Sequence, residues 1–268
     1  MKYKLLLIAL LPLALWAQES DSLHSQAVEH TRVRMLGVGQ TELLDTYLSP
    51  EHYTGGEFRL LSSDERKSRK YENISYFITH EAHLSLSNNR ADNNNEFAAM
   101  YNFQYAVHRH WQLFDGRLLL HAGPGIDANI GMLYNMRNGN NPTQLKLSLN
   151  LAPSGGASYT FTLWNKPLKV NYDLMFPILG VMFAPNFGQS YYEIFNRGNY
   201  DKNVRLTTVA STPSLRQMLS LDFKIKKCTF RVGYLGDYQQ ARINHLKYHS
   251  YSHMLMLGYV SHFTITKK

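Results

Sequence analysis

Histidines are the residues of this 268-residue sequence whose spacing comes nearest to a chemical site. His108 and His110 are two residues apart, so an extended strand would place them on one face. An imidazole beside a hydroxyl and a carboxylate can activate a nucleophile for hydrolysis. His121 and Asp127 would also share a face, but six residues of strand separate them by about 20 Å, too far for direct pairing. No HExxH, GxSxG or CxxC pattern is present. We therefore predict no catalytic residue.

Metal ligation is also not predicted. His245, His249 and His253 are spaced four residues apart, which gathers ligands on a helix but spreads them along a strand. Cys228 is the single cysteine of the chain, so no disulfide scaffold can form and we expect an inert thiol. The sequence predicts neither a metal site nor a cofactor.

The dominant pattern is strict alternation of apolar and polar residues, which is typical of β-strands. In the segment 215–225, Leu219, Leu221 and Phe223 share one parity, while Ser220 and Asp222 share the other. Several such segments run 11 to 16 residues, longer than the 5–6 usual in soluble domains and enough to cross a membrane at a tilt. The remaining segments are approximately 57–63, 73–87, 96–109, 117–132, 145–151, 156–164, 168–176, 230–239 and 252–265.

The N-terminal residues 1–17 form a secretory signal. Lys2 and Lys4 precede eleven mostly apolar residues, and Ala17 offers a small residue at the cleavage point. No later apolar run is long enough for a spanning helix. We expect residues 18–54 to form a periplasmic or plug-like segment and residues 55–268 to form the main domain. Removing the two lysines lowers the formal net charge from +8 to +6, and the excess is scattered, so no nucleic-acid partner is expected.

A soluble sandwich and a membrane barrel both produce alternation, but with opposite faces to the surroundings. The strands here are long, aromatic residues gather near their ends, and the polar parity is rich in Gly, Ser and Asn. These features favour an all-β, transmembrane, antiparallel up-and-down barrel of ten to twelve strands. The barrel must be closed because lipid offers no hydrogen-bond partner to a free edge.

The polar parity would then line the lumen. A barrel of this size is largely filled by side chains, so a wide channel is excluded, whereas a packed interior and a narrow polar pore both remain. On this pattern a lipid-facing Leu221→Arg should be more damaging than Arg216→Leu. The luminal candidates for ligand binding are His121, Asp127, Lys169, Asp173, Arg216, Asp222, Arg231 and Asp237.

Two stretches carry a family resemblance: TELLDTYLSPEHYTG at 41–55 and APNFGQSYYEIF at 184–195. With the signal and the strand series, they resemble an uncharacterised family of Gram-negative outer-membrane β-barrel proteins, known only as a domain of unknown function. The resemblance implies an outer-membrane barrel but no activity, cofactor or catalytic residue. The second stretch opens the strand-poor segment 189–210, which we expect outside the cell. Its aromatic side chains could hold it against the barrel mouth: Tyr191, Tyr192 and Phe195.

We therefore expect an integral barrel of the bacterial outer membrane. Its leading function is a narrow pore, or binding and passage of a small solute or lipid. One alternative is a structural or assembly-partner barrel. Another is a lipid-modifying enzyme that uses His108, His110 or His121. The expected partners are outer-membrane lipid, lipopolysaccharide, and a periplasmic or membrane protein.

Overall fold

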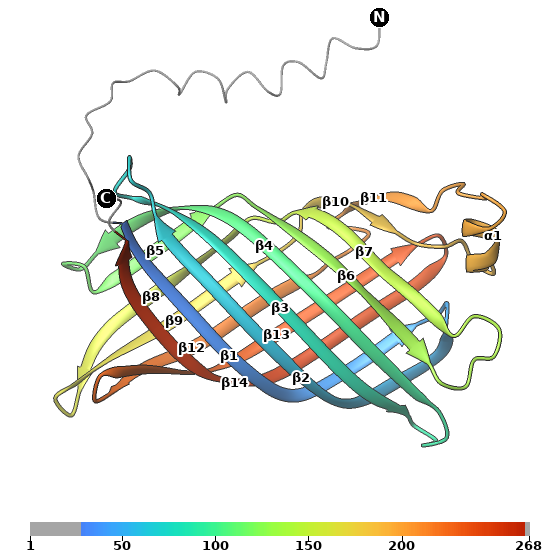
Figure 1. The fold of residues 1–268 in the computed structure, drawn as a ribbon, viewed down its shortest axis with the longest axis horizontal. Helices are drawn as coiled ribbons and strands as arrows, with labels where there is room; N and C mark the ends of the chain where they lie inside the picture. The colour runs from blue at the N-terminus through green and yellow to red at the C-terminus, as the bar shows by residue number, and fades with distance from the viewer. Residues whose placement is uncertain (1–27, 266–268) are drawn as a thin grey trace, which may run out of the picture.

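The computed structural model describes residues 28–265, so the predicted signal at 1–17 lies outside the described part of the chain. In this described range, fourteen strands form one antiparallel sheet, and a single short helix interrupts the longest loop (Figure 1). No helix in this range has the length and apolar character needed to span a membrane. The first strands are β1 (Val28–Asp45), β2 (Ser49–Lys67), β3 (Ile74–Asn89) and β4 (Asn95–Leu113).

Eight shorter strands form four pairs that are consecutive in the chain, and the two strands of each pair run in line across the barrel wall. We call each continuous crossing of the wall, whether one long strand or one such pair, a stave. The four pairs are β5 (Leu118–Gly123) with β6 (Gly125–Asn135), β7 (Thr143–Leu151) with β8 (Ser154–Leu163), β9 (Lys166–Met175) with β10 (Leu179–Phe183), and β11 (Val204–Thr208) with β12 (Leu215–Ile225). The wall ends with β13 (Cys228–Ile243) and β14 (Leu246–Ile265). Residues 28–265 thus contribute ten staves, within the predicted ten to twelve.

The sheet closes on itself. β5 pairs with both β4 and β8, and β1 pairs with β14, which completes the ring β1–β2–β3–β4–β5–β8–β9–β12–β13–β14. Towards the other end of the barrel, β11 pairs with β10 only. On its far side, the Arg242 N–H donates to the Ser211 carbonyl at 2.9 Å. The prediction of a closed, all-β, up-and-down barrel is confirmed.

The wall begins earlier than the sequence pattern predicted. Residues 28–54, expected to be a periplasmic or plug-like segment, instead supply β1 and the start of β2. The alternation is hard to see in β1 because apolar side chains stand on both faces. Met35 and Leu43 are buried inside, whereas Leu36 and Val38 are exposed outside.

Apolar side chains cover the outside of the barrel. Leu221 and its neighbours share the outward parity, and the most exposed members of this belt include Leu257 at 59% and Leu255 at 62%. The opposite parity is buried and polar, as Ser220 and Asp222 illustrate. A soluble monomer rarely exposes so continuous an apolar surface. A closed ladder inside an apolar belt is the architecture of a transmembrane barrel.

A band of proline residues crosses the four divided staves. The breaks fall at Pro124, Pro153, Pro177 and Pro213, each between the two strands of one stave. Proline has no backbone N–H, so its carbonyl can accept a hydrogen bond from the neighbouring strand, but the residue cannot donate one in return. The Val107 N–H, for example, donates to the Pro124 carbonyl at 3.0 Å. A proline therefore marks each of the four divisions.

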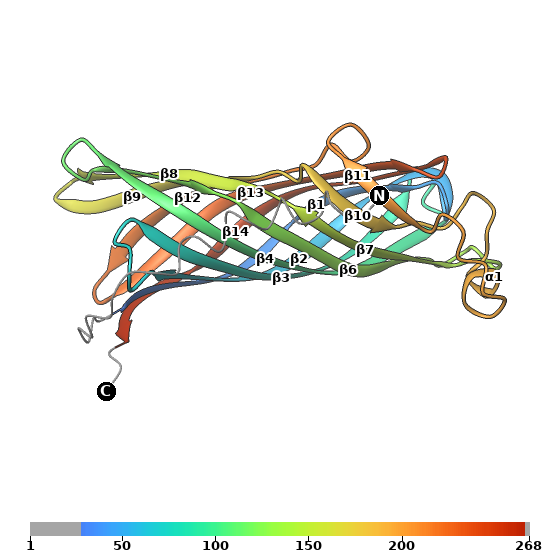
Figure 2. The same cartoon turned by 90° about the horizontal axis from the view of Figure 1, so that it is seen from above.

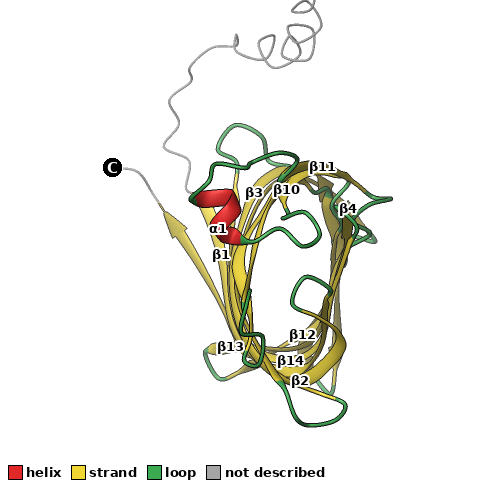
Figure 3. Ribbon diagram, turned by 90° about the vertical axis from the view of Figure 1, so that its right-hand side faces the viewer, coloured by secondary structure: helices red, strands yellow, loops and turns green. Residues whose placement is uncertain are grey.

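The two ends of the barrel differ. Both described chain ends lie at one end, where the hairpins are short, and the long β10–β11 loop lies at the opposite end (Figure 2). This loop contains α1 (Tyr191–Phe195), which sits at the rim of the ring of strands (Figure 3). Its Ile194 is fully buried. A cluster that includes Leu43, Tyr53 and Tyr248 fills the lumen in this half of the barrel.

Candidate functional site

A network of buried charges crosses the middle of the lumen. The guanidinium of Arg59, which is 0% exposed, donates to Glu57 at 2.7 Å, to Glu81 at 2.8 Å and to Asp237 at 2.8 Å. Arg216 donates to the same Asp237 carboxylate at 2.9 Å. We call these five residues the cross-lumen network. Such a pairing removes the charges from water without leaving either sign unpaired.

Amides extend this network to the opposite wall. Arg216, on β12, also donates to the Asn102 side chain on β4 at 2.7 Å. Asn102 in turn donates to Asp127 on β6, whose second oxygen accepts from Asn129 at 2.7 Å and from Asn150 at 3.2 Å. Side chains from both sides therefore meet in the centre. The network separates a hollow half of the lumen, at the end that carries the termini, from a more filled half at the loop end, where a smaller cavity of about 50 Å³ lies beside the network. We call these the hollow half and the filled half.

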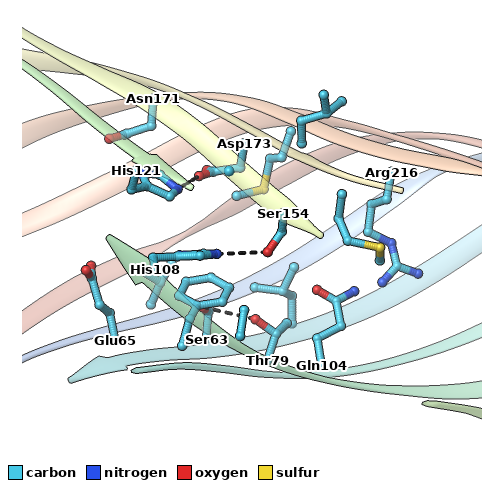
Figure 4. Close-up of a pocket in the computed structure, with 18 of the residues that line it drawn as sticks. Ser63, Glu65, Thr79, Gln104, His108, His121, Ser154, Asn171, Asp173 and Arg216 are labelled. Carbon is cyan, nitrogen blue, oxygen red and sulfur yellow. Dashed lines mark hydrogen bonds and ion pairs between the residues drawn. The ribbon is translucent and has the colours of Figure 1, made fainter. Parts of the chain in front are cut away.

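The hollow half is a chamber of about 160 Å³. A single water needs only about 10–15 Å³ of such space, so the chamber has room for a larger guest. It begins at Glu81 and Arg216 of the cross-lumen network and extends towards Thr31 and His110, at the end where β1 begins. Figure 4 shows its polar side chains pointing into this space.

One wall of the chamber is polar and carries imidazoles. His108 Nε2 is 2.8 Å from the hydroxyl of Ser154, although β4 and β8 are not neighbours (Figure 4). The strand between them presents Gly123, which pairs with Ser154. A Cβ at position 123 would lie 1.8 Å from the Val107 carbonyl oxygen, so only glycine fits between His108 and Ser154.

A second contact repeats this arrangement one stave further on. His121 Nε2 on β5 is 3.3 Å from Asp173 Oδ1 on β9, across Gly156 on β8. A Cβ at position 156 would lie 2.8 Å from both side chains. The rings of His108 and His121 are 4.9 Å apart between centroids. Two glycines therefore let four polar groups from non-adjacent strands form one cluster.

The third imidazole lies on the same wall, nearer the end of the barrel that carries the chain termini. His110 Nε2 contacts the Ser75 hydroxyl at 2.6 Å and Glu65 Oε1 at 3.3 Å. Its ring is 5.8 Å from that of His121. His108, His110 and His121 therefore line the chamber together, whereas the sequence pattern separated them.

The facing wall is apolar. Val33, Leu61 and Leu235 belong to a buried hydrophobic cluster on β1, β2, β13 and β14, and Met218 packs against it. All four line the chamber. The chamber is therefore amphiphilic, because aliphatic and thioether groups stand opposite imidazoles, hydroxyls and carboxylates.

The structure places the luminal candidates at three depths. His121, Asp173 and Lys169 line the chamber, whereas Asp127 lies on the far side of the cross-lumen network, consistent with the separation expected from His121. Arg216 and Asp237 form the network itself. The remaining two candidates, Asp222 and Arg231, pair with each other, because the Arg231 guanidinium donates two hydrogen bonds to the Asp222 carboxylate, at 2.6 and 2.8 Å.

Lys169 differs from the other cations of the chamber. Arg216 and Arg231 each pair with a carboxylate. Lys169 lines the chamber opposite Asp222 of β12, but Asp222 pairs with Arg231. Within residues 28–265, the Lys169 ammonium therefore forms no ion pair and remains available to an anionic guest.

The loop candidates lie at the opposite end. Tyr191 donates its hydroxyl to Gln144 at 2.7 Å and stacks on Phe195, with 5.9 Å between ring centroids. Tyr192 is exposed and faces Arg197. Burial, reinforced by nearby carboxylates, raises the pKa of Tyr47, whose hydroxyl bonds to the loop, to about 12. The aromatic residues thus hold the loop over the filled half of the lumen, away from the chamber.

The sequence contains one further indication that the chamber histidines lie close together, which the alternation alone does not reveal. The hairpin between β4 and β5 is symmetric about Asp115 and Gly116, which places His110 opposite His121. A turn at that dipeptide is recognisable from its residues alone. The contribution of Ser154 and Asp173 depends on a third and a fourth strand, which no local pattern specifies.

Several solved structures have a similar course of the chain. They are the outer membrane protease OmpT from Escherichia coli (7% identity, TM-score 0.47, 91% of this chain and 99% of that chain), the transport unit of the autotransporter AIDA-I from Escherichia coli (9%, 0.39, 92% and 94%) and the translocator domain of the autotransporter NalP from Neisseria meningitidis (11%, 0.38, 89% and 90%). We draw no functional conclusion from these distant likenesses. A comparison with curated proteins finds no match.

The sequence also matches a protein-family profile. One profile matches residues 3–268, which is nearly the whole chain. This match confirms the resemblance to an uncharacterised family, and the chain belongs to the family described as "Protein of unknown function (DUF3316)".

Proposed function

We propose that this protein is an outer-membrane barrel of a Gram-negative bacterium that binds a small anionic amphiphile in its chamber and does not conduct. The observation that carries the proposal is the position of the chamber, which ends at the cross-lumen network. A guest would enter from the end that bears the chain termini.

The outer-membrane location rests on the surface of the barrel. Its belt of exposed leucines suits hydrocarbon, and no edge of the main ring is left unpaired. Barrels of this type keep short turns on the periplasmic side and longer loops outside. The short hairpins beside the termini and the long β10–β11 loop support this orientation. The chamber would then face the periplasm.

The cross-lumen network favours binding over passage. Arg59 is fully buried, and its partners come from β2, β3 and β13. An ion moving through the barrel would have to separate these pairs, and breaking a buried pair costs about 3–5 kcal/mol. The hydrophobic cluster beyond the network adds a second obstruction.

The lining of the chamber suggests the class of guest. An apolar body would pack on Leu61, Leu235 and Met218, while an anionic group would meet the unpaired ammonium of Lys169. The hydroxyls and imidazoles of the polar wall could add hydrogen bonds. A short-chain carboxylate has both of these features.

A matched pair of probes tests this proposal. Octanoate and octylammonium share one chain but carry opposite charges, and each would be titrated into the barrel in lipid nanodiscs, with empty nanodiscs as the blank. We expect octanoate to bind and octylammonium not to bind. Lys169→Met should weaken octanoate binding about tenfold or more, since a hydrogen bond to a charged group contributes about 1.5–3 kcal/mol.

The control is Lys166→Met, which removes an exposed lysine from the adjacent hairpin and should leave binding unchanged. Equal binding of the two probes would contradict the proposed anion preference. Steady conductance of the unmodified barrel in a planar bilayer would contradict the closed lumen. Conductance would return the narrow pore to first place.

One contact favours a second function, hydrolysis of a lipid ester. The 2.8 Å contact between Ser154 Oγ and His108 Nε2 has the geometry of an activated serine. The carboxylate of Asp173, however, contacts His121 rather than His108, so a complete triad is not assembled. If the barrel hydrolyses a p-nitrophenyl ester, Ser154→Ala should abolish turnover and Ser158→Ala should not. Absence of turnover in the unmodified barrel would eliminate the hydrolase.

A further inference from the structure

Three side chains with the chemistry of metal ligands meet on the outer face of the barrel, near its loop end. They are Glu42 on β1, His52 on β2 and His249 on β14. One donor atom from each lies within 4.8 Å of the others. We propose that these three residues bind a divalent transition metal ion of the Zn²⁺ class. This site is separate from the chamber and does not depend on its function.

The distances suit such an ion. Glu42 Oε1 lies 2.8 Å from His52 Nδ1 and 3.5 Å from His249 Nε2. Ligand atoms about 2.0–2.1 Å from a tetrahedral Zn²⁺ are themselves about 3.3 Å apart. The two separations that involve Glu42 lie on both sides of that value, and all three donor atoms lie within 4.8 Å of one another, so side-chain rotations would bring them to the distances that the ion requires.

The fold holds the ligands in place before any ion arrives. β1 pairs with β2 on one side and with β14 on the other, and its Leu44 lies opposite His249. The ring of His249 stacks on Tyr251, with 4.5 Å between centroids and 4° between planes. The imidazoles of His52 and His249 are 5.1 Å apart. Both rings therefore approach Glu42 from opposite neighbouring strands.

One ligand atom is buried without a hydrogen bond. Among the described residues, His249 Nε2 is a buried nitrogen that lacks a hydrogen-bond partner, and its nearest carboxylate is that of Glu42 at 3.5 Å. A buried polar atom without a partner is costly. A metal ion would satisfy this nitrogen and would also hold Glu42 and His52.

The donor set determines which metals fit. Two imidazoles and one carboxylate suit Zn²⁺, Cu²⁺ or Ni²⁺, whereas Ca²⁺ and Mg²⁺ prefer sites built entirely from oxygen. Three protein ligands leave the fourth position of a Zn²⁺ ion open. Because the ligands come from β1, β2 and β14, the ion would also join the first and last strands of the barrel. Binding to the folded state alone would increase resistance to unfolding.

The test is a titration of the full mature barrel, without a polyhistidine tag, with ZnCl₂ and separately with CaCl₂. We expect one equivalent of Zn²⁺ to bind, with no saturable binding of Ca²⁺. His249→Gln, His52→Gln and Glu42→Gln should each weaken Zn²⁺ binding by about tenfold or more, since even supporting residues of metal sites contribute that much. Co²⁺ should give the visible absorption of a tetrahedral site.

The matched control is His253→Gln, which removes another outward histidine from the same strand. His253 contacts Tyr234, so this substitution should leave the Zn²⁺ affinity unchanged. Circular dichroism of each variant reports whether the barrel is folded. The proposal is overturned if the unmodified barrel binds no Zn²⁺, or if a folded His249→Gln barrel binds it with unchanged affinity.

Discussion

Pro124 and Pro153 face each other across two neighbouring staves. The register requires this arrangement, since β5 pairs Gly123 with Ser154 and the ladder continues without a shift into β6 and β7. Pro153 borders the chamber, because Ser154 and Ala152 line it. The wall beside the polar cluster therefore lacks two backbone N–H donors.

This arrangement predicts local mobility that a single change would reduce. Pro124→Ala supplies an N–H that can return the bond to Val107, which contributes about 0.5–1.5 kcal/mol. Without the proline ring, the unfolded chain gains conformational entropy, which destabilises the folded barrel by about 0.4–1 kcal/mol and offsets most of the gain from the new hydrogen bond. We expect slower amide exchange around residues 107 and 124–126, measured by mass spectrometry, with little change in overall stability. Pro142→Ala, in the β6–β7 loop, is the control; unchanged exchange in Pro124→Ala would refute the explanation.

The cross-lumen network predicts a large cost for Arg216→Leu. The change removes one partner of Asp237 and the link to Asn102 inside the lumen. Breaking a buried pair in this way should lower the free energy of unfolding by about 3–5 kcal/mol. Guanidinium unfolding in lipid vesicles would measure it. Lys224→Leu, on the same face of the same strand but at its exposed end, should change stability by less than about 0.5 kcal/mol.

Alternation alone ranks Arg216→Leu as milder than Leu221→Arg, but the contacts of Arg216 reverse that expectation. A lipid-facing arginine near the centre of the membrane costs about 2–4 kcal/mol. Leu221→Arg should therefore reduce the yield of folded barrel to a similar or smaller extent than Arg216→Leu. The shift in electrophoretic mobility on heating provides the folded fraction. A nearly unchanged yield for Leu221→Arg would overturn the assignment of the outer face.

The loop anchor predicts a dependence on alkaline pH. The pKa of Tyr47 is raised to about 12, mainly by burial, whereas an unfolded tyrosine ionises near pH 10. Its neutral hydroxyl donates to the Gln189 carbonyl at 3.0 Å, so this hydrogen bond contributes fully to the free energy of unfolding below pH 10. The contribution is lost as the pH rises from about 10 through about 12. Tyrosinate absorbance of the unmodified barrel minus that of Tyr47→Phe should give a single titration near pH 12; a midpoint near pH 10 would contradict the anchor.

The sequence predicts which way side chains face far better than it predicts what they meet. Alternation assigned Arg216, Asp222 and Asp237 to the lumen, and all three are buried there. One residue of register decides the face of a whole strand, so a strong pattern leaves little freedom. The alternation pattern did not reveal β1, because Met35 and Leu36 are both apolar although only Leu36 faces outward.

Contacts across the lumen depend on quantities that local patterns do not contain. Arg216 meets Asn102 because of the number of staves and their stagger, which a sequence of alternating residues leaves open. The outer cluster shows the same limit. The spacing of His249 with His245 and His253 suggested no site, and its actual neighbours, Glu42 and His52, lie on two other strands.

The pairing of β1 with β14 joins residues more than 200 positions apart, such as Val28 and Ile265. Contacts of such long sequence separation make folding slow, because the chain must lose much entropy before they form. Nearly the whole chain must therefore be synthesised before the barrel can close. Until then, both terminal strands have unpaired edges, which favour aggregation.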